Sequence, residues 1–455
     1  MFKNQDNSLS KGHELLKKYA FFVLIFFCIF IPFRSPISDF TFSNVKALTD
    51  VLTISVLLWF VIDSKLRLKF RLQDFLFLGF LGLAFISTVF VNNSSISVFI
   101  YQVRSIGMYY IFYFCIRNFG YGKKEFITIL KVLQIVSFTL LALGIVEKIS
   151  SKTLFFPESV SNAILYPSNF TRVYSMFYNP NTFGLFIIMT ILLSWTAQLF
   201  LEHRTNIVIY CALFLSLWLS MSRSSLIVIC FMAFVFLGYI VLTRKIKENW
   251  LQILKTSAIV VVVVFLANLL INWGTHQYYT EFIATHRIES APVAGSSLDL
   301  DFSDRLDEVN SDTIVDNSSS DGRIYSVKTC FKVLKDYPLV GAGFGTYGSA
   351  ASLVYGSPIA KDYKLSTTFY SDIEYAKLLA ENGILGTLIF VAFLFAVLWD
   401  NRKSFFKIIL CVTIAWFGLF YNIFEVQIGA MLLWSTLSFN IDNTLFFLKK
   451  AEPKV

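Results

Sequence analysis

Long apolar runs separated by short polar segments dominate the chain. Twelve of these runs approach the length of roughly 18 to 20 residues that an α-helix needs to cross a bilayer. They lie at about residues 19–33, 46–62, 75–91, 96–116, 126–146, 182–201, 206–221, 224–242, 253–271, 383–399, 405–422 and 427–447. The pattern predicts an all-α integral membrane protein with about twelve transmembrane helices.

The distribution of lysine and arginine predicts how these helices are oriented. Basic residues gather in the N-terminal segment, in alternate connections and in the C-terminal tail, whereas the short connections between them hold few. Because basic residues are retained on the cytoplasmic side, both termini are predicted to be cytoplasmic. No small-residue cleavage site follows the first apolar run, so it is interpreted as a retained span and not as a signal peptide.

One connection on the opposite side is very long and divides the chain into three regions. Residues 1–271 form an N-terminal membrane bundle of about nine spans, residues 272–382 a large extracytoplasmic loop, and residues 383–455 the C-terminal spans with a short cytoplasmic tail. Within the loop, about 289–320 is acidic and Ser/Asp-rich, which is typical of a mobile segment. The apolar spacing over about 321–336 predicts an amphipathic helix, suited to lie along the membrane face or to cover the bundle.

The composition agrees with a membrane protein and excludes several other classes. Hydrophobic residues make up 56% of the chain and charged residues 15%. The net charge of +9 reflects the basic cytoplasmic segments and gives no indication of a nucleic-acid partner. The six cysteines show no metal or disulfide spacing, and the acidic segment lacks a Gly-centred calcium loop, so no metal site is predicted.

Arg223 is the only charged residue in the apolar stretch from Asn206 to Leu242, where it falls between two predicted spans. A guanidinium at membrane depth is costly unless it faces a polar cavity or an anionic headgroup. Arg223 is therefore either a turn residue that reaches lipid phosphates or part of a site that binds an anion.

Three further arginines are candidates. Arg172 precedes an Asn-Pro-Asn sequence at 179–181, which predicts a helix start with free amides that favour an anion; an ordinary helix entry is the alternative. Arg323 begins the predicted amphipathic helix and by itself is typical of a surface charge. Arg104 lies within a predicted span, where it needs an ion-pair partner or a water-filled cavity.

Polar residues also gather at the start of the tenth predicted span, in "FYSDIEYAKLLAENGILG". Carboxylates are favoured near the positive end of the helix dipole, so a structural helix entry explains Asp372 and Glu374. Alternatively, Asp372 or Glu374 accepts a proton from a hydroxyl as a general base. Upstream of them, Gly341, Gly343 and Gly345 predict a turn whose backbone approaches a ligand or another helix.

Four motifs in order, "RVYSMFYNPNTFG", "SMSRSS", "DGRIYSVKTCFKVLKDYPLVGAGFGTY" and "DIEYAKLLAENGILG", resemble the O-antigen ligase and O-antigen polymerase superfamily of bacterial membrane glycosyltransferases. The resemblance covers roughly residues 170–400. It implies transfer of a glycan from an undecaprenyl-diphosphate carrier, without a metal or another cofactor, on the outer face of the cytoplasmic (inner) membrane.

The resemblance also implies roles for single residues. The family's arginines bind the diphosphate, which matches Arg223 and Arg323 and, less closely, Arg172. Where ligases have a histidine that activates the acceptor, nine positions before Glu381, this chain has Asp372. This departure favours the polymerase branch, with Asp372, and Glu374 in reserve, as the catalytic base.

The predicted function is therefore an inverting, metal-independent polymerase that joins lipid-linked repeat units into O-antigen, capsule or exopolysaccharide. Its expected partners are the undecaprenyl-diphosphate-linked donor and acceptor, membrane lipid and a chain-length regulator protein. A ligase that moves the glycan to a lipid, protein or wall acceptor is the alternative. A transporter of lipid-linked glycans is a third function, but it predicts repeated halves, whereas the polar motifs here cluster on one face.

Overall fold

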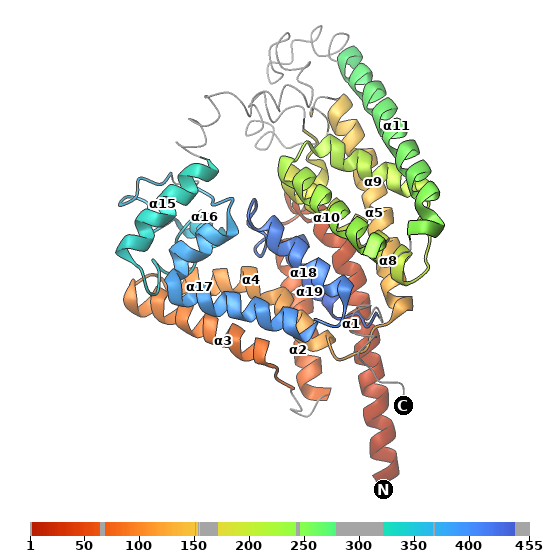
Figure 1. The fold of residues 1–455 in the computed structure, drawn as a ribbon. Coiled ribbons are helices and arrows are strands. Elements are labelled where there is room, and N and C mark those ends of the chain that lie inside the picture. Colours follow the sequence, from red (N-terminus) through yellow and green to blue (C-terminus); the bar gives the residue numbers. More distant parts are fainter. Residues whose placement is uncertain are drawn as a thin grey trace. The chain divides into compact units, whose positions relative to one another are not determined.

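The computed structural model describes residues 2–63, 69–150, 152, 154, 172–242, 246–278, 322–366 and 369–441. Over these ranges the regular elements are all helices, as predicted for the fold class (Figure 1). The acidic segment predicted at about 289–320 lies outside them. The chain forms two compact units: the first contains 1–24, 49–121 and 312–455, and the second contains 25–48 and 122–311.

The first unit is built around two pairs of neighbouring helices. Its elements are α2 (Leu48–Asp63), α3 (Leu72–Phe85), the π-helix η2 (Ile86–Val91), α4 (Ile96–Ile116), α15 (Arg323–Asp336), α16 (Ala350–Tyr355), α17 (Glu374–Asp400), α18 (Phe405–Phe417) and α19 (Gln427–Leu437). Helix α17 packs along α3, and α19 packs along α4. Packed aromatic rings fill the interior because large rings bury much apolar surface; Phe80 and Phe390, for example, contact each other in a tilted arrangement with centroids 5.1 Å apart.

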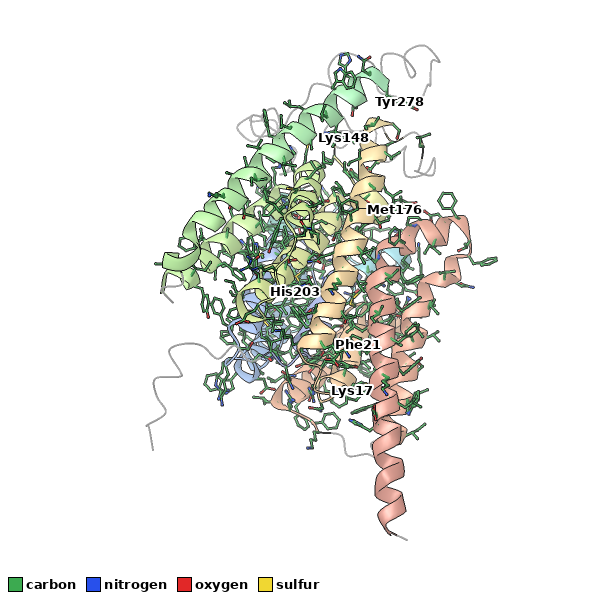
Figure 2. All side chains as sticks on the ribbon, turned by 90° about the vertical axis from the view of Figure 1, so that its right-hand side faces the viewer. Lys17, Phe21, Lys148, Met176, His203 and Tyr278 are labelled. Atoms are coloured by element: carbon green, nitrogen blue, oxygen red, sulfur yellow. The ribbon has the colours of Figure 1, made fainter. Side chains whose placement is uncertain are left out.

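The second unit surrounds one central helix. It contains η1 (Ser43–Ala47), α5 (Lys123–Ile149), the short η3 (Ser175–Phe177), α8 (Pro180–Phe200), α9 (Ile207–Ser220), α10 (Arg223–Leu242) and α11 (Ile246–Tyr278), and α1 (Phe2–Phe40) contributes to both units. Helix α8 is buried along most of its length and contacts α5, α9 and α10. Lys148 and Tyr278 lie toward one end of this unit and His203 toward the other, with Met176 between them (Figure 2).

Eight of the described helices are long and apolar enough to cross a membrane. Helices α9, α18 and α19 are shorter apolar helices, and α4 is not among the eight. A helix occupies each of the twelve predicted ranges, but twelve spans and the three-region division stay predictions. Helices α18 and α19 end at Phe417 and Leu437, before the predicted 422 and 447, and the irregular segment between them carries the polar Asn422 and Glu425 into the interior.

The glycine-rich turn after α15 approaches another helix. The Ala342 amide donates to the Ala380 carbonyl of α17 at 2.9 Å. Gly341 has a φ of 74°, and a Cβ there would lie 2.3 Å from the Glu381 carbonyl carbon. Only glycine permits this backbone-to-backbone contact, so of the two alternatives for this turn the structure supports helix packing at Gly341.

Candidate functional site

Two of the predicted site residues meet at the surface of the first unit. Arg323 begins α15 and Asp372 precedes α17, and their Nε and Oδ2 atoms are 3.9 Å apart. Both side chains are partly exposed, at 37% and 44%. The Ser326 and Ser371 hydroxyls, 2.8 Å apart, connect the same two segments and hold the pair in register.

The phenol of Tyr370, two residues before Asp372, interacts electrostatically with nearby carboxylates. Burial raises the pKa of Tyr370 well above its ordinary value, and the carboxylates of Glu425, Glu374 and Asp372 raise it further. Removing the phenol proton would add a further negative charge near these three carboxylates, which is unfavourable. Tyr370 therefore stays protonated and can only act as a neutral hydrogen-bonding group beside Asp372.

Glu374, the second predicted base, lies in the interior. Its side chain is 2% exposed, and its Oε1 is 2.9 Å from Lys377 Nζ. Its Oε2 accepts a hydrogen bond from the Phe424 amide at 3.0 Å. Both carboxylate oxygens are thus engaged by the protein itself.

Lys377 is the centre of a buried polar cluster. Its Nζ also lies 2.7 Å from Glu425 Oε1 and donates to Asn422 Oδ1, and Gln102 donates to Glu425. We refer to Gln102, Glu374, Lys377, Asn422 and Glu425 as the Lys377 cluster. Because its members come from α4, α17 and the segment after α18, it joins three parts of the first unit.

In the second unit, Arg172 is held by oxygen atoms from two other segments. Its Nη2 donates to Asn181 Oδ1 at 3.1 Å, and its Nε donates to the Ser220 carbonyl at 3.3 Å. The Ser222 hydroxyl donates to the same Asn181 Oδ1 at 2.9 Å. A single amide oxygen therefore connects Arg172 with the turn between α9 and α10.

Arg223 is the next residue after Ser222 and the first residue of α10. Its guanidinium is partly buried and makes no hydrogen bond or ion pair with any other residue that the structure describes. The flanking serines 220, 222, 224 and 225 are all buried. The turn thus combines one partly buried cation, Arg223, with four buried serines.

The Asn-Pro-Asn sequence forms the start of α8, and its own side chain accepts the hydrogen bonds of the first helical amides. The Asn179 side chain accepts hydrogen bonds from the Asn181 and Thr182 amides at 2.9 and 3.1 Å. These first amides of α8 are therefore engaged by an N-cap residue, which supports an ordinary helix entry, one of the two alternatives for this motif. The side chain of Asn181 is the part of the motif that contacts Arg172.

A buried ion pair fixes the segment that carries Arg172. Glu147 accepts hydrogen bonds from the Tyr174 and Ser175 amides at 2.9 and 2.6 Å and pairs with Lys152. Lys152 in turn donates to the Arg172 carbonyl at 2.5 Å. Burial lowers the pKa of Lys152, and the Glu147 carboxylate partly offsets this effect. This ion pair was not predicted, because neither Glu147 nor Lys152 belongs to one of the motifs.

Of the two alternatives for Arg104, an ion-pair partner or a water-filled cavity, the structure shows an ion pair with Asp50. Its Nε donates to Asp50 Oδ2 at 2.5 Å, from α4 to α2.

Within the described ranges no group of three or more His, Cys, Asp or Glu side chains is placed to hold a metal ion. The predicted site residues are divided between the two units. Arg323, Asp372 and Glu374 belong to the first unit, and Arg172 and Arg223 belong to the second.

Comparison with known proteins identifies part of the chain. A family model described as O-antigen ligase matches residues 208–391, which include Arg223, Arg323, Asp372 and Glu374 but not Arg172. A search of curated proteins found no match. Residues 208–391 are thus similar to the O-antigen ligase family, in agreement with the resemblance that the ordered motifs indicated.

Proposed function

We propose that this chain is a polysaccharide polymerase that joins undecaprenyl-diphosphate-linked repeat units at the outer face of the bacterial cytoplasmic membrane. The observation that carries the proposal is the partly exposed pair of Arg323 and Asp372, 3.9 Å apart within the matched domain. Such a pair offers a cation for a phosphate and a base for a hydroxyl on one surface.

Asp372 is the proposed base, and its exposure supports this choice over Glu374. A general base must come within hydrogen-bond reach of the hydroxyl whose proton it takes. Asp372 is 44% exposed, whereas Glu374 is 2% exposed and engaged by Lys377. We assign Glu374 a structural role in the Lys377 cluster.

The reaction follows from these roles. The hydroxyl oxygen of the acceptor sugar attacks the anomeric carbon of the donor and forms the new glycosidic bond, while its proton passes to Asp372. The bond from that carbon to the diphosphate breaks, and undecaprenyl diphosphate leaves with the electron pair. Attack from the face opposite the leaving group inverts the anomeric centre.

Guanidinium groups are the proposed partners of the leaving diphosphate. They pair with phosphate oxygens through two parallel hydrogen bonds and stabilise the negative charge that grows as the bond breaks. We assign this role to Arg223 and Arg323, and to Arg172 as an auxiliary group. The absence of a protein partner for the Arg223 guanidinium among the described residues supports its assignment.

A ligase is the second candidate function, because the matching family model is described as O-antigen ligase. The two functions differ only in the acceptor: a polymerase uses another lipid-linked glycan, and a ligase uses a lipid, protein or wall acceptor. Asp372 at the position of the ligase histidine supports the polymerase.

The test is reconstitution of the purified full-length protein in liposomes with lipid-linked repeat units, with chain length measured on a gel. We expect chain growth that a chelator does not abolish. Asp372→Asn should reduce the rate by roughly 10²- to 10⁴-fold, the contribution typical of a general base. Arg223→Ala should reduce it by a comparable factor. The exposed Asp362→Asn and Arg402→Ala are matched controls that should retain the rate.

Full activity of both site variants would overturn the assigned roles. Transfer only to a non-glycan acceptor would favour the ligase. Movement of the lipid-linked glycan across the liposome without bond formation would favour a transporter.

A further inference from the structure

Helix α15 has two chemically different sides. Its buried side, formed by Ser326, Thr329, Cys330 and Val333, packs into the first unit. The opposite side exposes Lys328, Lys332 and Lys335 together with Ile324 and Phe331. At 3.6 residues per turn these five positions fall on one face, directly across from the buried one.

The positive charge of this face is not neutralised by the rest of the described structure. Lys328, Lys332 and Lys335 make no ion pair with any described residue. Asp336, the acidic residue of the helix, accepts a hydrogen bond from the Tyr363 hydroxyl at 2.5 Å. We refer to Ile324, Lys328, Phe331, Lys332 and Lys335 as the lysine face.

The segment after α15 is fixed against two candidate membrane spans of the same unit. The Ile384 and Leu385 amides of α17 donate to the carbonyls of Pro338 and Leu339, each at 3.0 Å. The Ser87 hydroxyl, near the end of the span Leu72–Val91, donates to the Val340 carbonyl at 2.7 Å.

Apolar side chains are exposed at this level. Leu339 is 60% exposed, and Ile384 and Leu385 of α17 are 44% and 43% exposed. An exposed apolar surface on a candidate membrane span is suited to face lipid, and the segment that follows α15 lies against this surface.

We propose that the lysine face binds the phosphate groups of anionic lipids, with Phe331 and Leu339 entering the upper acyl region. Alternating cationic and large apolar side chains on one helix face match the chemistry of an anionic membrane surface. A bound headgroup would restrain α15 and, with it, the position of Arg323. The inference does not depend on the proposed polymerase activity.

Hydrogen exchange of the full-length protein in nanodiscs tests this proposal. The probe is phosphatidylglycerol, added to phosphatidylcholine nanodiscs. Because each lysine near an anionic surface contributes to binding, exchange over 323–336 should slow by roughly fivefold or more when the anionic lipid is present. The triple variant Lys328→Gln, Lys332→Gln, Lys335→Gln should lose this difference.

The matched control is a triple variant on α5, Lys123→Gln, Lys124→Gln, Lys131→Gln, whose lysines are equally exposed. It should keep the lipid-dependent slowing over 323–336. Unchanged exchange over 371–385 in the lysine-face variant would show that the fold is intact.

Three results would overturn the proposal. The first is the absence of slowing in the unmodified protein, and the second is slowing that survives in the lysine-face variant. The third concerns the acidic segment of the same chain: if changing Asp299, Asp301, Asp304 and Asp307 to Asn speeds exchange over 323–336 in pure phosphatidylcholine, that segment and not lipid occupies the face.

Discussion

Two cations, Lys377 in the first unit and Arg172 in the second, are held in different ways. In the first unit the ammonium of Lys377 lies between the carboxylates of Glu374 and Glu425, so charge is held by opposite charge. In the second unit the guanidinium of Arg172 is held by the neutral oxygens of Asn181 and Ser220. The first arrangement pairs an ammonium with two carboxylates, whereas these two contacts of Arg172 are hydrogen bonds to uncharged oxygens.

This difference separates a structural cluster from a candidate binding group. A buried ion pair fixes the segments that contribute to it, because removing either partner leaves an isolated charge in the interior. Hydrogen bonds to uncharged oxygens orient a guanidinium without adding a charge of their own. We interpret the Lys377 cluster as architecture, and ligand binding by the arginines of the second unit stays a proposal.

The largest expected effect comes from removing the central cation of the first unit. Lys377→Met leaves Glu374 and Glu425 buried without this counter-charge and should lower the free energy of unfolding by about 3–5 kcal/mol. The measurement is thermal unfolding of the purified protein in detergent. Lys332→Gln, at an exposed lysine, is the control and should change stability by less than about 0.5 kcal/mol. A wild-type melting temperature for Lys377→Met would refute the structural role of the cluster.

A smaller effect is expected at the neutral acceptor of the second unit. Asn181→Leu removes the oxygen that receives hydrogen bonds from Arg172 and Ser222, and a hydrogen bond to a charged group contributes about 1.5–3 kcal/mol. We expect affinity for inorganic diphosphate, measured by titration calorimetry, to fall roughly tenfold. Unaltered affinity would show that Asn181 does not orient the guanidinium.

Asn181→Asp sharpens this test, because it keeps the acceptor oxygen but adds a negative charge. Its stability should remain close to that of the unmodified protein, while its affinity for diphosphate falls, since a carboxylate beside Arg172 opposes an anion. Loss of stability in both variants with affinity unchanged would indicate a purely structural residue.

The sequence located the helices because each follows from an apolar run of sufficient length. It placed the end of α18 too late, since hydropathy does not show that Asn422 and Glu425 turn inward. The Lys377 cluster was also beyond prediction. Gln102 and Glu425 stand far from Lys377 along the chain, and only the packing of α4 and α17 brings them together.

The candidate site was predicted as a set of residues but not as a geometry. The motif order identified Arg323 and Asp372, yet nothing in their spacing indicates that their side chains meet. Likewise Asp372 and Glu374 were interchangeable as bases, because two positions in one motif do not reveal which carboxylate faces inward. In the structure Asp372 is partly exposed, whereas Glu374 is buried.

The smallest effect on stability is expected for Arg323 and Asp372, and it tests whether burial is what distinguishes the two kinds of charge pair. Both side chains are more than a third exposed, so water screens their attraction. A double-mutant cycle with Arg323→Gln and Asp372→Asn should give a coupling in unfolding free energy of less than about 1 kcal/mol. The same cycle measured on chain growth should show a large loss for each single variant, because the proposed diphosphate ligand and the proposed base act in one reaction. Strong coupling in stability with full chain growth would place the pair with the Lys377 cluster, as architecture and not as the reactive surface.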